Sequence, residues 1–110
     1  MRARYQQGAL VCGSCSGVFA LGEAGVLNGK RCTTTWWLHD ELKQRFPKAN
    51  AVWASELIDD NGIITAGGPL SWVTIALHVV QKLAGIETAK VVADFSVVDA
   101  VPKSQNLYVP

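Results

Sequence analysis

The sequence has no excess of charge of either sign. Ten basic and nine acidic residues are spread along 110 positions and leave a net charge of +1. Surfaces that bind nucleic acids gather Lys and Arg into a strongly positive patch. We therefore expect no direct contact between this chain and DNA or RNA.

Long hydrophobic runs are also missing. No apolar stretch approaches the roughly 18 residues that cross a bilayer, and Met1–Gln7 contains no apolar signal core. We therefore expect neither a membrane partner nor export. Three cysteines form an odd set, which without an export signal predicts free thiols and a cytoplasmic location. No second cysteine pair is present to complete a zinc site, so we expect no metal and no cofactor.

What the sequence does contain is enough apolar material for one core. Hydrophobic residues make up 49% of the chain, and a chain of this length suits a single domain. The most informative stretch is Gly13-Ser14-Cys15-Ser16-Gly17. It lies between an apolar run at 9–12, which predicts a short buried strand, and a helical pattern that ends near residue 24.

Strand, tight turn, nucleophile and helix is the order of a nucleophile elbow. Such a turn crowds its own backbone, so small residues are expected on both sides of Cys15. Ser16 is the expected N-cap of the helix. The thiol of Cys15 would then lie over the first helical turn, where unpaired N–H groups and the helix dipole favour a thiolate. Cys15 is therefore the candidate nucleophile.

Further strands and helices alternate along the chain. Strands are expected at 31–35 and 51–53, and a β-hairpin at 56–59 and 63–65 around Asp60-Asn61-Gly62. Helices are expected at 2–7, 16–24, 36–46, 70–83 and 87–97, with a loop at 66–69 and a mostly irregular tail at 102–110. This order predicts an α/β sandwich with a mainly parallel sheet. Only one strand precedes the elbow, so the chain reads as the second half of a domain.

At this level of detail the chain resembles a known superfamily. Residues 8–31 resemble the elbow region of the ThiJ/PfpI-type, class I glutamine amidotransferase-like proteins, to which DJ-1 belongs. Cys32-Thr33-Thr34-Thr35-Trp36 resembles their Ala-Thr-Thr-His-Trp signature. Residues 64–72, Leu77–Val80 and Tyr108–Pro110 resemble one branch, the amidotransferase-like sensory domain of AraC-type transcription regulators. The resemblance implies a flavodoxin-like, three-layer αβα fold.

The resemblance also implies what lies outside these residues. Residues 1–110 would form a partial domain without its N-terminal half and without the DNA-binding domain of the regulators. An open edge or uncovered face of the sheet should then promote association. We expect a homodimer or a companion chain that supplies the N-terminal half, and contact with DNA only through a domain outside this sequence.

Catalytic relatives carry a histidine at the position of Thr35, which leaves Cys15 without its usual base. His39 lies one helical turn further on, but its helix should point it elsewhere. His78 lies in an apolar helix stripe and reads as a structural histidine with a backbone partner. The isonitrile hydratases of the superfamily work without the histidine and use a carboxylate from the N-terminal half. Ser16 would match the hydroxyl residue after their nucleophile, and its N–H would donate to an oxyanion.

Three functions therefore remain open: a sensory domain for an unknown small molecule, a cysteine-dependent hydrolase or hydratase, and a redox or stress-response protein. The residues expected to line a ligand pocket at the elbow are Gly13, Ser14, Gly17, Thr35, Trp36, Gly67, Gly68 and Trp72. A working Cys12–Cys15 dithiol is disfavoured because strand alternation should bury Cys12. Cys32 is expected to be a buried hydrophobe.

One group of charges is assigned no role. Glu56, Asp59 and Asp60 fall on the expected hairpin. Acidic side chains in such a position normally face water. They are therefore expected to form its solvated face.

Overall fold

The structure, a computed structural model, describes residues 1–99 and 104–110. The helices are α1 (Arg2–Gln6), α2 (Val18–Glu23), α3 (His39–Arg45), α4 (Trp72–Ala84) and α5 (Ile86–Ser96). The strands are β1 (Val11–Ser14), β2 (Arg31–Cys32), β3 (Asn50–Ala51), β4 (Leu57–Asp60) and β5 (Ile63–Ala66). Single 3₁₀ turns cover Cys15–Gly17, Trp36–Leu38 and Gln105–Leu107.

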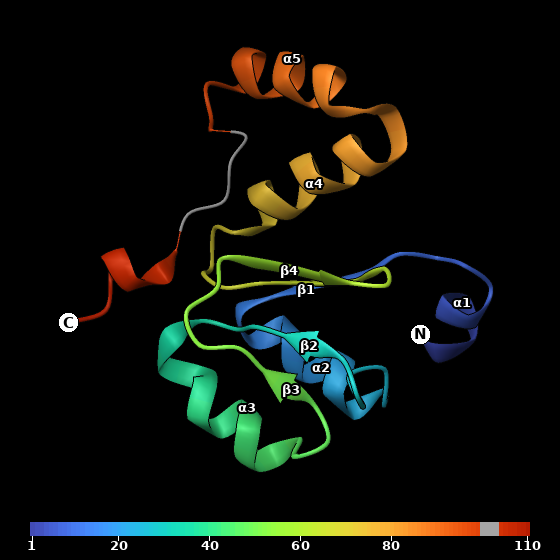
Figure 1. Cartoon of the computed structure of the whole chain (residues 1–110), viewed down its shortest axis with the longest axis vertical. Coiled ribbons are helices and arrows are strands. Elements are labelled where there is room, and N and C mark those ends of the chain that lie inside the picture. The colour runs from blue at the N-terminus through green and yellow to red at the C-terminus, as the bar shows by residue number, and fades with distance from the viewer. Residues whose placement is uncertain (100–103) are drawn as a thin grey trace.

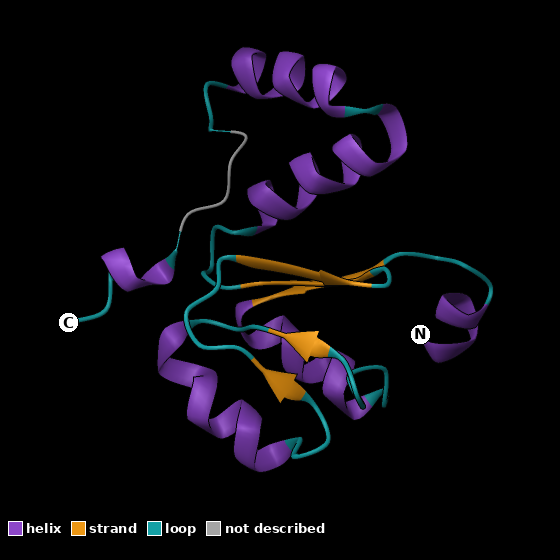
Figure 2. Cartoon of the chain, viewed as in Figure 1, coloured by secondary structure: helices purple, strands orange, loops and turns teal. Residues whose placement is uncertain are grey.

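The strands form the middle layer of three (Figures 1 and 2). β1 and β5 are parallel, β5 and β4 form an antiparallel hairpin, and β2 and β3 pair in parallel beside them. Helices α2 and α3 lie on one side of the strands, and α4 and α5 lie on the other. The expected αβα sandwich with a mainly parallel sheet is confirmed.

Strand alternation divides the core between the two sides. Ile63 packs in a cluster with Val18, Leu21 and Leu42, beneath α2 and α3. Its neighbour Ile64 points the other way and packs in a second cluster with Ala66 and Ile75 of α4. Successive residues of a strand face opposite sides of the sheet, so β5 serves both clusters.

Three expected strands are shifted or shortened, among them the strand expected at 51–53, which covers Asn50–Ala51. The first begins at Val11 rather than Ala9, because the Ala9 N–H is bonded to the Arg4 carbonyl at the end of α1. β2 ends at Cys32, because the Thr33 N–H turns to a side chain, the Thr65 hydroxyl, at 2.9 Å. This bond ties the β2–β3 pair to the larger sheet.

The helix expected at 16–24 begins later than predicted. Cys15–Gly17 form a 3₁₀ turn, Gly17 occupies the N-cap position of α2, and no side chain caps the helix. The prediction that Ser16 is the N-cap is therefore wrong, because Ser16 already lies inside the turn that joins strand and helix. The helices expected at 70–83 and 87–97 are confirmed within a few residues.

The hairpin carboxylates are not a solvated face, so that prediction is wrong. Glu56 accepts a hydrogen bond from Ser71, at 2.7 Å. Asp60 accepts from the Arg31 backbone N–H, at 2.8 Å. Asp59 meets His78 of α4, whose Nε2 lies 2.7 Å from Oδ2. The expected backbone partner of His78 is therefore also wrong. Helix α4 packs on this hairpin, and polar side chains of α4 and of its N-cap meet Glu56 and Asp59.

Asp59 ties the hairpin to α4 in a way that depends on pH. Burial raises the pKa of its carboxyl, but hydrogen bonds from His78, Lys82 and the Gly62 N–H lower it by more, and the net pKa lies below the ordinary 3.8. Stability gained from a lowered pKa is present above 3.8 and is lost as the pH falls through the folded-state value.

We therefore expect the stability difference between the native chain and Asp59→Asn to shrink as the pH falls below 3.8. Urea unfolding at a series of pH values measures this difference. Asp94→Asn, on the exposed side of α5, is the matched control. An unchanged Asp59→Asn difference down to the lowest pH would contradict the assignment.

One edge of the sheet is open. Within residues 1–99 and 104–110, β1 pairs only with β5. Helix α5 and the residues after it expose Phe95 (88%) and Val97 (91%). Cys12 is exposed as well, so the prediction that alternation buries it is wrong. Strand alternation points Cys12 toward the α4 side of the sheet. Because β1 is the edge strand, however, this side chain remains exposed to solvent.

No helix in the described part of the chain has the length and apolar character needed to span a membrane.

Candidate functional site

Cys15 lies directly after β1 at the start of the 3₁₀ turn that leads into α2. Its φ is +51°, a left-handed conformation that is uncommon for a residue with a side chain. A β-carbon at Gly13 would lie 2.9 Å from Leu21 Cδ1 and 3.3 Å from the Gly17 carbonyl oxygen, so Gly13 must be small. A β-carbon at Gly17 would meet only open space. The expected crowding therefore applies to one side of the elbow alone.

Three threonines support the elbow from below. Thr33, Thr34 and Thr35 are almost completely buried. The Thr34 hydroxyl donates to the Cys15 carbonyl oxygen at 2.7 Å, which fixes the backbone of the elbow. Thr35 lies where the resemblance leads us to expect histidine in a catalytic relative, and a hydroxyl cannot accept a proton near neutral pH.

Both histidines of the chain are engaged elsewhere. His39 packs edge-on against Trp53, with ring centroids 5.2 Å apart, and burial lowers its pKa and keeps the ring neutral. His78 is held by Asp59 beneath α4. Neither is hydrogen-bonded to the Cys15 thiol in the described residues, so no imidazole base for this thiol is in place.

The three cysteines are free and differ in environment. Burial and the nearby charge of Asp59 raise the pKa of Cys12. Cys32 is fully buried, which raises its pKa to about 11 and confirms it as a core residue. Cys15 is partly exposed.

We expect iodoacetamide at neutral pH to alkylate Cys15 first, Cys12 more slowly and Cys32 least. For Cys32, a pKa of about 11 against the ordinary 9.0 lowers the thiolate fraction about 100-fold. Peptide mass spectrometry of the native chain, Cys12→Ser and Cys15→Ser gives the rates. The two single variants are needed because Cys12 and Cys15 share one tryptic peptide. Faster labelling of Cys12 than of Cys15 would contradict an accessible elbow thiol.

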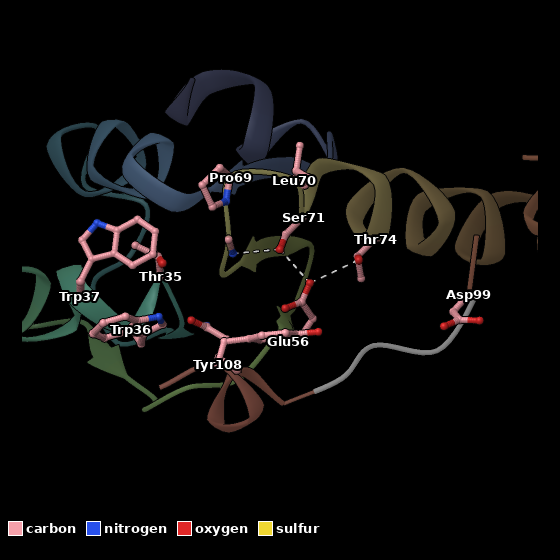
Figure 3. A pocket seen from close by; sticks show the side chains of 12 residues that line it. Thr35, Trp36, Trp37, Glu56, Pro69, Leu70, Ser71, Thr74, Asp99 and Tyr108 are labelled. Atoms are coloured by element: carbon pink, nitrogen blue, oxygen red, sulfur yellow. Dashed lines mark hydrogen bonds between the residues drawn. The ribbon is translucent and has the colours of Figure 1, made fainter. Parts of the chain in front are cut away.

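A cavity of about 660 Å³ opens beside Thr35 (Figure 3). Four segments form its wall: the start of the Trp36–Leu38 turn, the residue before β4, the loop into α4, and the C-terminal residues. The lining residues are Thr35, Trp36, Trp37, Glu56, Gly68, Pro69, Leu70, Ser71, Thr74, Asp99, Gln105 and Tyr108. This volume is in the range of small-molecule sites.

The cavity takes in only some of the residues expected at a pocket. Thr35, Trp36 and Gly68 line it. The other predicted site residues do not: Gly13, Ser14, Cys15, Ser16, Gly17, Gly67 and Trp72. Trp72 begins α4 and is 60% exposed to solvent. A role for these residues in ligand contact or catalysis stays a prediction.

Gln105 lines the cavity, and no motif in the sequence marks it as a site residue. Its Nε2 donates to the carbonyls of Thr34 (2.8 Å) and Ser55 (2.7 Å), and its side chain is buried. Gly67 makes room for it, because a β-carbon there would lie 2.1 Å from Nε2. The side chain that needs the space at Gly67 thus comes from a residue 38 positions further along the chain.

Glu56 is a carboxylate of the cavity wall that two hydroxyl groups hold in place. Its Oε1 accepts from the hydroxyls of Ser71 (2.7 Å) and Thr74 (3.3 Å). The Ser71 Oγ in turn accepts from the Gly68 N–H at 2.8 Å. Sequence reasoning placed Glu56 on a solvated hairpin, and only the packing of α4 shows otherwise.

Comparison with known proteins identifies the family of this chain. The sequence profile of the DJ-1/PfpI family matches residues 1–82. The chain belongs to the DJ-1/PfpI family. The resemblance noted from the elbow and the threonine segment is therefore confirmed.

Among curated relatives of the DJ-1/PfpI chain, the isonitrile hydratase of Pseudomonas putida is 36% identical over 93 residues, which cover 84% of this chain and 39% of the relative. The HTH-type transcriptional regulator ArgR of Pseudomonas aeruginosa is 29% identical over 97 residues, covering 87% of this chain and 29% of the relative. The chain thus spans less than half the length of either protein.

The fold agrees with solved structures of the family. The crystal structure of Drosophila melanogaster DJ-1beta superposes with a TM-score of 0.76 at 26% identity, covering 89% of this chain and 51% of that one. The present chain, which has the open β1 edge, therefore corresponds to about half of the DJ-1beta structure.

Proposed function

We propose that this chain is the ligand-binding part of an amidotransferase-like sensory domain of an AraC-type transcription regulator, that it works in the cytoplasm, and that it has no catalysis of its own. The observation that carries the proposal is a ligand-sized cavity beside Thr35, to whose described lining the candidate nucleophile Cys15 does not contribute. The similarity to the regulator ArgR supports this choice.

A second candidate is a cysteine-dependent hydratase. It is favoured by the 36% identity to an isonitrile hydratase and by the left-handed backbone of Cys15, which keeps the geometry of an elbow. In this case the carboxylate that assists the thiol would come from residues outside this chain.

Two measurements on the purified chain separate the candidates. The first is hydration of a simple alkyl isonitrile by the chain mixed with an N-terminal fragment of the family, which would supply the assisting carboxylate; formation of the N-substituted formamide is followed, with Cys15→Ala as the control. The second is a thermal-shift screen of small metabolites, repeated with Trp36→Ala. The sensory proposal expects no Cys15-dependent turnover and at least one ligand whose stabilisation is lost in Trp36→Ala. Turnover that disappears in Cys15→Ala would overturn it in favour of the hydratase.

We propose further that the open β1 edge and the apolar face at Phe95 and Val97 are covered by another chain, either a second copy or a companion that supplies the N-terminal half. An unpaired strand edge and exposed apolar side chains each promote association. Light scattering on the purified chain tests this: a dimer supports the second copy, and a monomer that binds an N-terminal fragment of the family supports the companion. A monodisperse monomer that binds neither contradicts both. DNA would be reached only through a separate domain.

A further inference from the structure

The cavity beside Thr35 is acidic. Its described lining residues include two carboxylates, Glu56 and Asp99, and no Lys, Arg or His. Carboxylates at a partly closed surface attract positive charge and repel anions, and the effect is stronger where water is excluded. Among the described residues of the wall, the carboxylate of Glu56 therefore favours a cation over a carboxylate or phosphate ligand.

Glu56 is fixed in position by two hydroxyls. The Ser71 and Thr74 hydroxyl protons both point to Oε1. Among the described residues Oε2 has no hydrogen-bond partner, and Figure 3 shows the carboxylate between these hydroxyls and the aromatic end of the cavity. The hydroxyl bonds hold one oxygen, and the other remains available to a ligand.

Aromatic rings form the other side of the cavity. Trp36 and Trp37 meet edge to face, with centroids 5.5 Å apart and planes at 86°. Trp37 is 54% exposed and Tyr108 is 68% exposed, an unusual position for large rings. Two perpendicular indoles form a corner with electron-rich faces, which bind alkylammonium groups by cation–π attraction.

We propose that the cavity takes a small organic cation, an ammonium or quaternary ammonium group on a short apolar body, with its charge between Glu56 and the Trp36–Trp37 corner. The inference rests on the proposed sensory function and names the class of its ligand. The volume of about 660 Å³ suits a free metabolite-sized molecule rather than a folded partner. The apolar body would lie against Pro69 and Leu70, which line the same wall.

The test uses three probes of one shape and different charge. Choline carries the quaternary ammonium, 3,3-dimethylbutan-1-ol replaces its nitrogen by carbon, and 3,3-dimethylbutanoate carries a negative charge. Calorimetric titration of the native chain should show choline binding at least ~10-fold more tightly than the neutral alcohol. The anion should bind more weakly than either.

Two variants and one control test where the cation binds. Glu56→Gln keeps the acceptor for Ser71 and Thr74 but removes the charge, and it should abolish the preference for choline over the alcohol. Glu87→Gln, which removes the same charge at the exposed start of α5, should leave the preference unchanged. Trp37→Leu should weaken choline binding several-fold, and because this side chain is half exposed the variant should fold.

The outcomes distinguish a failure of the cation assignment from a failure of the proposed sensory function. Equal or tighter binding of the neutral alcohol or the anion overturns the cation assignment and leaves a ligand-binding domain. A choline preference that survives Glu56→Gln overturns the site. If none of the three probes binds and the metabolite screen also yields no ligand, the sensory function itself fails.

Discussion

Replacement of Gln105 by alanine is expected to lower the free energy of unfolding by about 2–4 kcal/mol. The buried carbonyls of Thr34 and Ser55 would both lose their donor, and a buried acceptor left without a partner costs about 1–3 kcal/mol. Because Gln105 also lines the cavity, binding of any ligand there should weaken. Urea unfolding and ligand titration of the same variant measure the two effects.

Substitutions at two neighbouring glycines test the same contact from the residues that face Gln105. Gly67→Ala should act like Gln105→Ala, because its β-carbon would collide with the buried amide of Gln105. Gly68→Ala should be tolerated, since its β-carbon would lie 3.4 Å from Ser71 Oγ, an ordinary contact. Equal stability of all three variants and the native chain would show that Gln105 does not anchor the C-terminal residues.

Thr65→Val is expected to cost about 2 kcal/mol of folding free energy. Thr65 is fully buried on β5, and its hydroxyl accepts the Thr33 N–H at 2.9 Å. Valine has the same shape but offers a methyl group to that buried N–H. The bond is also one of the links between the β2–β3 pair and the β1–β5–β4 sheet, so the threonine segment beside the elbow should loosen.

Thr65→Ser is the control, because it keeps the hydroxyl and removes only a methyl group. Its loss of stability should stay well below that of valine. Hydrogen exchange of the Thr33 amide gives a local readout: fast exchange is expected in Thr65→Val and slow exchange in Thr65→Ser. The same loss in both variants would assign the effect to packing rather than to the hydrogen bond.

The elements that the sequence predicts well are those with local signals. The hairpin follows from Asn61-Gly62 between two apolar runs, and it forms with Asn61 and Gly62 in left-handed conformations. The later helices follow from their apolar periodicity. The elbow follows from small residues around Cys15. Boundaries are missed where a backbone group finds a distant partner, as the Thr33 N–H does with Thr65.

The sequence by itself determined the family and the layer order, because both depend on residue types at short spacing. Only the tertiary structure decided which residues share the cavity. Glu56 becomes part of its wall when α4 packs on the hairpin, and Gln105 reaches Thr34 across 71 positions. Contacts of this kind depend on how elements pack rather than on local pattern, and no periodicity in the chain encodes them.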